Sequence, residues 1–261
     1  MLGIKRTLKN YIRYKPLVRE LVLRDLKVKY RRSFLGYIWS LLNPLLMMSV
    51  MSVVFSYMFR YNIPNYPLYL ICGQTLWTFF NESTNMAMYS IIQNASLIKK
   101  VYIPKYIFPI SRVVSCFVTM SFSLVAILIV MVATKASFSP YIVLFPIPLV
   151  LLFVFCMGIS FILSSLSVYF RDIVHLYGVL TMAWMYLTPI FYPVEALPIE
   201  IFNIVKFNPM YSYITFFRDI VLFNQIPELT IWLNCFLASF ISILIGFVVF
   251  RKSQRNFILY I

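Results

Sequence analysis

Long apolar runs, separated by short polar segments, dominate the pattern of this chain. A helix that crosses a bilayer needs about 20 mostly apolar residues. Six runs meet that requirement: 35–59, 66–92, 106–133, 141–168, 174–192 and 230–250. Proline or a turn containing proline marks most of the gaps between the runs. The pattern therefore predicts an all-α integral membrane protein with six transmembrane helices in one membrane domain, residues 35–250.

The segment before the first run has a different pattern. Val18, Leu21, Val22 and Leu26 recur at spacings of three and four residues, and charged residues occupy the opposite face. This periodicity is typical of an amphipathic helix that lies in the membrane interface. We therefore expect residues 1–34 to form an interface segment, with an N-terminal amphipathic helix over 18–31.

The longest connection, residues 193–229, is mostly apolar and is not typical of a solvated linker. Its stretch 207–223 is too short to span, and a central Arg218-Asp219 pair makes spanning costly. Asn208 followed by Pro209 is typical of a helix N-cap and first helical residue, and Pro198 marks a second helix start. The pattern predicts two short re-entrant helices between spans 5 and 6. Such segments are tolerated where they are buried in protein or line a cavity, which favours a gate.

Composition and charge support a membrane protein and set its orientation. The chain is 62% hydrophobic and 12% charged, whereas a soluble domain has about 25% charged residues. The net charge of +15 comes from basic residues beside apolar runs, which indicates anionic lipid headgroups and excludes nucleic acid as the favoured partner. By the positive-inside rule both termini, including the tail 251–261, are cytoplasmic. Only four of the 23 lysines and arginines fall on the other side, namely Arg60, Lys135, Lys206 and Arg218.

Residues with catalytic or metal-binding chemistry are sparse. The chain has one histidine and four dispersed cysteines, so it offers no metal-ligand spacing and no catalytic residues. It has no phosphate-binding GxxxxGK[ST] motif, so energy for active transport must come from a partner or an ion gradient. Glu82 is the clear ionisable residue within a predicted span, and we expect it to face the bundle interior or a cavity. Lining or packing is favoured for Glu82 over proton coupling.

Aromatic residues also occur inside the predicted spans. Most are expected to pack between helices or at the membrane interfaces. A subset can offer a flat apolar face to sugar rings along a pathway. The candidates for this glycan pathway, together with Glu82, are Trp39, Tyr57, Trp77, Tyr177, Trp184 and Tyr186.

Four segments together resemble the permease subunits of type 2 ABC exporters of polysaccharide and polyol phosphate. They are Arg24–Leu46, Asn94–Pro104, Tyr169–Ile173 and Leu187–Pro193. Asn208-Pro209-Met210 and Phe217-Arg218-Asp219 extend the likeness over essentially the whole chain. One departure is Ile103-Pro104, where the family often has Phe-Pro, and this affects only the packing of that loop.

The resemblance implies an assembly and a substrate. The chain would pair with a second copy and with two ABC ATPase subunits, which bind ATP and Mg²⁺, while this chain binds no cofactor. It would lie in a bacterial plasma membrane and export a glycan, such as O-antigen, capsule or wall glycan, on a polyprenyl-diphosphate carrier. Two rivals remain open. One is a permease of the same type for a small hydrophobic compound, and the other is a membrane enzyme acting on lipid-linked sugars, which the lone histidine and scattered acids disfavour.

The resemblance also implies roles for particular residues. Segments 198–206 and 209–223 would be gate helices, with Pro198, Asn208, Pro209, Arg218 and Asp219 as gate residues. The lipid diphosphate would meet Arg24, Lys27, Lys29, Arg31 or Arg32, since arginine suits phosphate by bidentate geometry. The segment that contacts the ATPase would carry Asn94, Leu97, Ile98, Lys99, Lys100, Tyr102 and Pro104.

Overall fold

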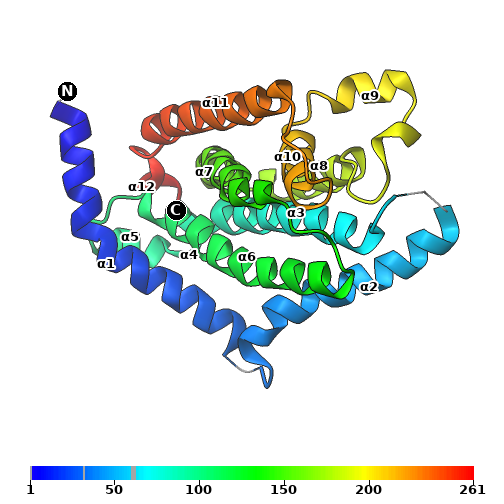
Figure 1. The fold of residues 1–261 in the computed structure, drawn as a ribbon. Helices are drawn as coiled ribbons and strands as arrows, with labels where there is room; N and C mark the ends of the chain where they lie inside the picture. The colour runs from blue at the N-terminus through cyan, green and yellow to red at the C-terminus, as the bar shows by residue number, and fades with distance from the viewer. Residues whose placement is uncertain (1, 32, 60–62) are drawn as a thin grey trace.

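A computed structural model describes the backbone of residues 2–31, 33–59 and 63–261. Every long element in these residues is a helix (Figure 1). Short 3-10 turns at Gly36–Ile38, Pro140–Leu144 and Val194–Ala196 precede α2, α7 and α9. The helices are α1 (Leu2–Tyr30), α2 (Trp39–Phe59), α3 (Tyr66–Met88), α4 (Ser90–Gln93), α5 (Ala95–Lys100), α6 (Ile107–Ala133), α7 (Pro146–Tyr169), α8 (Ile173–Leu187), α9 (Ile199–Val205), α10 (Pro209–Val221), α11 (Leu229–Ser253) and α12 (Phe257–Tyr260).

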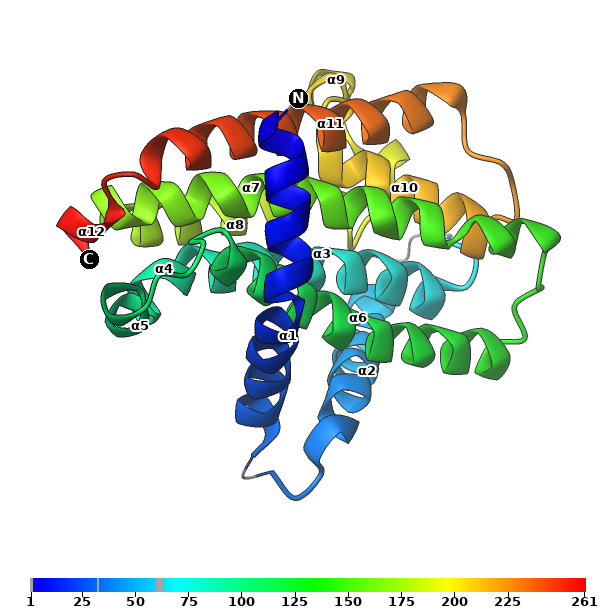
Figure 2. The ribbon, with the colours of Figure 1, turned by 90° about the vertical axis from the view of Figure 1, so that its left-hand side faces the viewer.

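The long helices form a bundle around α3 and α7. Helix α7 packs against α11, α3 and α10, and α6 covers α3. Helix α1 crosses α6 at a steep angle, and α2 returns from the end of α1 toward the start of α3 (Figures 1 and 2). Helices α4, α5 and α12 gather at one end of the bundle, on the left of Figure 2. The basic helix α5 and the C-terminal helix α12 thus lie at the same end of the bundle.

The structure confirms an all-helical membrane protein. Four helical segments are long and apolar enough to cross a membrane, namely Gly36–Phe55, Ile107–Ala133, Pro140–Tyr169 and Leu229–Ser253. They coincide with the first, third, fourth and sixth predicted spans. Helix α3 is long but more polar, and α8 has only 15 residues, which is about 22 Å at the α-helical rise. The crossing of α3 and α8, and hence the count of six, stays a prediction.

Several predicted boundaries need correction. The second predicted span ends at Met88 instead of residue 92, because the chain turns at Tyr89 and restarts as the short helix α4. The fifth ends at Leu187 instead of 192. Pro189 disfavours helical backbone in the residue before it and has no N–H to donate. Residues 188–192 consequently form an irregular segment.

The ends of the chain are more helical than predicted. Helix α1 runs as one element from Leu2 to Tyr30, well beyond the amphipathic segment 18–31. Helix α11 continues to Ser253, and α12 lies inside the predicted tail 251–261. Two short helices, α9 and α10, occupy the connection between predicted spans 5 and 6, and their re-entry into the membrane as gate helices stays a prediction. Asn208 caps α10 as predicted, since its side chain accepts a hydrogen bond from the Met210 backbone N–H.

Two glycines allow α7 and α11 to touch backbone to backbone. A Cβ on Gly158 would lie 2.2 Å from the Ser242 carbonyl carbon, and one on Gly246 would lie 2.3 Å from the Gly158 oxygen. Ser239 on α11 also donates to the Leu151 carbonyl of α7 at 2.7 Å. Small residues are the usual means of close helix association in membranes, where burial of apolar surface supplies little driving force. This contact fixes the centre of the bundle.

Candidate functional site

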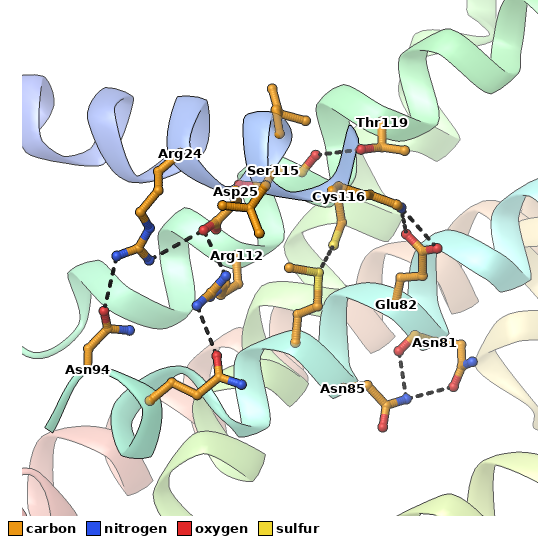
Figure 3. A pocket seen from close by; sticks show the side chains of 15 residues that line it. Arg24, Asp25, Asn81, Glu82, Asn85, Asn94, Arg112, Ser115, Cys116 and Thr119 are labelled. Atoms are coloured by element: carbon orange, nitrogen blue, oxygen red, sulfur yellow. Dashed lines mark hydrogen bonds and ion pairs between the residues drawn. The ribbon is translucent and has the colours of Figure 1, made fainter. Parts of the chain in front are cut away.

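A cleft lined by several charged and polar side chains lies where α1, α3 and α6 meet. Its larger hollow has a volume of about 730 Å³ and is lined by Asp25, Lys29, Glu82, Asn94 and Arg112, among others (Figure 3). A second hollow of about 420 Å³ continues between α2, α3 and α6 and shares Lys29 and Glu82 with the first. We call these two hollows together the polar cleft.

Asp25 lies at the centre of the contact between α1 and α6. Its carboxylate is only 4% exposed and is 2.8 Å from Arg112 Nη1. Ser115 Oγ donates to the other oxygen at 3.3 Å, and Arg24 Nη2 is 3.3 Å from the first. A buried carboxylate is tolerated only when it is paired and hydrogen-bonded. These contacts therefore fix the position of α1 on α6.

The same group of residues reaches the start of α5. Arg24 Nη1 donates to Asn94 Oδ1 at 3.5 Å, and Arg112 Nη2 donates to Gln93 Oε1 at 3.0 Å. Asn94 separates α4 from α5, and its amide donates to the Ser90 carbonyl at 2.8 Å. We call Arg24, Asp25, Gln93, Asn94 and Arg112 the Asp25 network. It connects α1 and α6 to the segment expected to contact the ATPase.

The sequence pattern does not mark Asp25, Gln93 or Arg112 as site residues. Asp25 follows Leu21 by four residues and Val22 by three, so it falls on the apolar face of α1. The side chains of Leu21, Val22 and Asp25 are all buried. The only sign of a site in the sequence was that one acidic residue, Asp25, falls among the apolar residues on that face of the helix. Its partner Arg112 was counted only as a topological charge because nothing in the sequence pairs residues 25 and 112.

The predicted ATPase-contact segment is divided by the structure. Helix α5 covers only Ala95–Lys100, and the chain is extended at Val101. Ile98 is buried and Leu97 is half-buried, so packing within the chain accounts for their apolar character. Tyr102 is 91% exposed, and Lys99 and Lys100 are also exposed. Pro104 is half-buried and precedes the turn into α6.

Lys105 fixes the end of this segment to the C-terminal region. Its Nζ donates to the Gln254 carbonyl at 2.5 Å and lies 5.6 Å from the centroid of the Phe257 ring. Partial burial lowers the pKa of Lys105 below its usual value, because desolvation penalises the ammonium form. Residues 95–102 thus protrude between two fixed points, the Asp25 network and Lys105.

Two of the residues expected to meet a lipid diphosphate, Arg24 and Lys29, line the polar cleft. Lys29 Nζ pairs with both Glu82 oxygens, at 3.0 and 3.2 Å. Lys27 and Arg31 are exposed, and Arg24 belongs to the Asp25 network. Arg32 lies outside the described residues. Glu82 faces a cavity as expected, and it precedes Met88, the end of α3, by about 9 Å at the α-helical rise.

The candidate glycan-pathway aromatics whose side chains the structure describes do not line one common surface. Trp77 packs edge-on against Trp184 at 6.2 Å between ring centroids, and Tyr177 is buried with its hydroxyl 2.7 Å from Thr84 Oγ1. Helix packing accounts for these three. Trp39 and Tyr186 are exposed, and Trp39 lines the second hollow of the polar cleft. The side chain of Tyr57 lies outside the described residues.

The candidate gate residues fasten α10 to the end of α8. Asn208 Oδ1 accepts from Trp184 Nε1 at 2.7 Å, and its amide donates to Thr188 Oγ1 at 2.8 Å. Pro209 is the first residue of α10, and Pro198 is an exposed N-cap residue of α9. Asp219 accepts from Gln225 Nε2 at 2.9 Å. The Asn208 contacts position the start of α10 against the end of α8, and the Asp219 contact joins the end of α10 to the loop that follows it.

Arg218 is the buried centre of this region. Its guanidinium donates to the carbonyl oxygens of Pro189 at 2.7 Å, Ile190 at 2.9 Å and Tyr69 at 3.1 and 3.2 Å. Its central carbon lies 3.4 Å from the centroid of the Tyr69 ring. A Cβ on Gly73 would come within 2.7 Å of Arg218 Nη2, so glycine leaves the required space. The buried carbonyl groups of the irregular segment after α8 thereby receive hydrogen bonds from the Arg218 side chain.

Known proteins resemble this chain over most of its length. An O-antigen export system permease protein RfbA of Myxococcus xanthus is 32% identical over 85% of this chain and 86% of its own length. A Klebsiella pneumoniae protein of the same name is 31% identical over 90% of both chains. The polysialic acid transport protein KpsM of Escherichia coli is 24% identical over 92% of this chain and 95% of its own.

These relatives are permeases and transport proteins by name. Residues 16–222, which include α5, the polar cleft and α10, match the family described as ABC-2 type transporter. This match covers well over half of the chain, and it agrees with the all-helical membrane fold. The chain therefore belongs to the ABC-2 type transporter family.

Proposed function

We propose that this chain is the permease subunit of an ATP-driven exporter that moves a polysaccharide, linked to a polyprenyl diphosphate, across the bacterial inner membrane. The observation that carries the proposal is the set of similar proteins. Export permeases for O-antigen align with 85–90% of this chain at 31–32% identity. Proteins named for polysialic acid transport and capsule polysaccharide export also align. Glycan export is the activity that these names share.

ATP hydrolysis belongs to separate ATPase subunits in this proposal. Lys99, Lys100 and Tyr102 form the exposed surface on which an ATPase subunit docks. Tyr102 supports this, since a nearly fully exposed tyrosine has no role in the packing of this chain. A displacement of α5 is then transmitted to α1 and α6 through the Asp25 network. Asn94 is hydrogen-bonded to Arg24 of α1, and Gln93 is hydrogen-bonded to Arg112 of α6.

The proposal includes a second copy of the chain, with the glycan moving between the two copies. Apolar side chains of α2 and α8 are exposed, such as Val50, Val53, Val179 and Met182. These faces are suited to lipid or to the second copy. Trp39 and Tyr186 lie on the same two helices and remain the candidates for sugar contact. The side chains of Trp77, Tyr177 and Trp184 pack inside each copy and support the wall of that path.

Substrate entry is proposed at the cytoplasmic side, beside the basic residues of α1. Both termini lie on that side. Arg24, Lys27, Lys29 and Arg31 supply cations near the polar cleft, where a diphosphate group carries the opposite charge. On the outer side, α9 and α10 act as the gate. The anchoring of α10 by Arg218 supports a gate that moves as a unit with the end of α8.

Transport by the reconstituted complex tests the proposal. The chain is co-expressed with its ATPase partner, purified, and inserted into liposomes loaded with a polyprenyl-diphosphate glycan. We expect ATP-dependent movement of the glycan to the face opposite the ATPase. Movement of small hydrophobic dyes without glycan movement would favour the rival permease function. Covalent change of the glycan without ATP would favour the membrane enzyme.

A further inference from the structure

We propose that Glu82 occupies the binding position of a substrate diphosphate on Lys29, and that the arriving diphosphate displaces it. The inference rests on the proposed function, because it assigns a switching step to the same entry site. We call the Lys29–Glu82 ion pair the latch. The latch joins the C-terminal end of α1 to α3. Binding of the substrate diphosphate would break this contact and so change how α1 is held against α3.

The latch differs from the other ion pair that holds α1. Asp25 and Arg112 are only 4% and 12% exposed, so that pair is largely shielded from water. Lys29 and Glu82 are 38% and 37% exposed, and both face the polar cleft. Half-exposed ion pairs contribute little stability, whereas buried pairs are costly to break. The buried pair therefore anchors α1, and the latch is the contact that a ligand can exchange.

The position of Lys29 makes it accessible from several directions. Its side chain lines both hollows of the polar cleft, and it also lines a third hollow of about 470 Å³ with Val28, Arg31 and Ser33. The third hollow lies on the basic edge of α1, where an anionic headgroup would first arrive. A phosphate oxygen entering there reaches the same ammonium group that Glu82 holds from inside the cleft.

Electrostatics favours the exchange. A lysine ammonium is a compact charge with three rotatable donors, so it can change acceptors without moving its backbone. A diphosphate carries more negative charge than one carboxylate and offers more acceptor oxygens. Glu82, once displaced, stays hydrated because its side chain already contacts the open cleft. Like-charge repulsion between Glu82 and the diphosphate then separates α3 from the end of α1.

Titration of the assembled complex tests the latch. The complex with its ATPase is placed in nanodiscs of neutral phosphatidylcholine, and a short-chain polyprenyl diphosphate is titrated. We expect E82Q to bind the probe about fivefold more tightly, because it removes a competing ion pair of up to about 1 kcal/mol. E82A gives a second measurement in which no amide remains to contact Lys29. E20Q is the matched control, since it removes one exposed carboxylate from α1 outside the cleft.

The gain must depend on Lys29. In the K29Q background, E82Q should change the affinity by less than twofold. An equal gain with and without Lys29 would mean a long-range charge effect and would overturn the latch, as would unchanged or weaker binding by E82Q. An equal gain with phosphatidylglycerol in place of the diphosphate would make ordinary phospholipid the occupant and overturn it too. If the wild-type complex bound no polyprenyl diphosphate at all, the proposed function itself would fail.

Discussion

Arg218 shows how one side chain can hold a helix in place through backbone groups alone. Its planar guanidinium reaches three carbonyl groups on two segments, the start of α3 and the chain after α8. Substitution by alanine leaves these buried acceptors without donors. Each hydrogen bond to a charged group contributes about 1.5–3 kcal/mol. We therefore expect R218A to lower the free energy of unfolding by about 3 kcal/mol or more, as measured by SDS titration.

Lysine at the same position keeps the charge but loses the forked geometry. R218K should therefore fall between wild type and R218A. K206A is the control, because Lys206 is exposed in the same region and contacts the neighbouring Asn203. Equal stability of R218K and wild type would show that charge alone holds α10. The sequence pattern marks Arg218 as unusual because a charge in an apolar segment is costly, but its carbonyl partners lie 28, 29 and 149 positions away.

At the scale of elements, the Asp25 network determines how α1 lies on α6. Asparagine at position 25 removes the negative charge and leaves Arg112 buried with a neutral partner. Breaking a buried pair by removing one member costs about 3–5 kcal/mol. We expect D25N to loosen α1, with faster hydrogen–deuterium exchange in residues 14–30. ATP hydrolysis by the complex should persist while glycan transport falls at least tenfold.

The double variant D25N/R112Q distinguishes the energy of the Asp25–Arg112 pair from the effects of the two single substitutions. D25N/R112Q has no unpaired buried charge, so it should recover part of the stability that D25N loses. E20Q again serves as a control on the exposed face of α1. If exchange in α1 were unchanged in D25N, the carboxylate would not be the anchor that its burial and contacts indicate.

The crossing of α7 and α11 gives a second prediction at this scale. G158A places a Cβ 2.2 Å from a backbone carbon of α11, and backbone cannot yield as a flexible side chain can. We expect G158A to destabilise the fold by more than 1 kcal/mol, within the range for overpacking. G178A is the matched control. A Cβ there meets nothing within 4 Å, so alanine should be neutral or stabilise α8 by up to about 1 kcal/mol.

The periodicity of the sequence predicted these helices better than it predicted their ends. Apolar runs and the Asn208-Pro209 cap located α6, α7, α10 and α11 within a few residues. The break at Tyr89 and the early end of α8 were missed. Apolar composition continues past both positions. At α8, Pro189 ends the helix, and the hydrogen bonds from Arg218 to residues 189 and 190 hold the irregular segment that follows.

At the scale of the whole molecule, the exposed end of α5 is the proposed docking surface for the ATPase. K99E/K100E reverses two exposed charges without touching buried Ile98. We expect this variant to fold normally but to lose most of the co-purifying ATPase subunit. K252E is the control, because Lys252 is exposed near the C-terminus on the same predicted side. Undiminished co-purification of K99E/K100E would place the docking surface elsewhere.

The number of membrane crossings is the remaining property of the whole molecule. If α3 and α8 both cross, the loops on either side of each must face opposite compartments, although α8 is only about 22 Å long. The four native cysteines are buried, so single added cysteines can be labelled with little background. We expect S137C and E195C to react with an impermeant maleimide from outside intact cells. K99C and R171C should react only after permeabilisation. Protection of E195C in intact cells, with R171C also protected, would remove α8 from the set of spans and leave the termini on opposite sides.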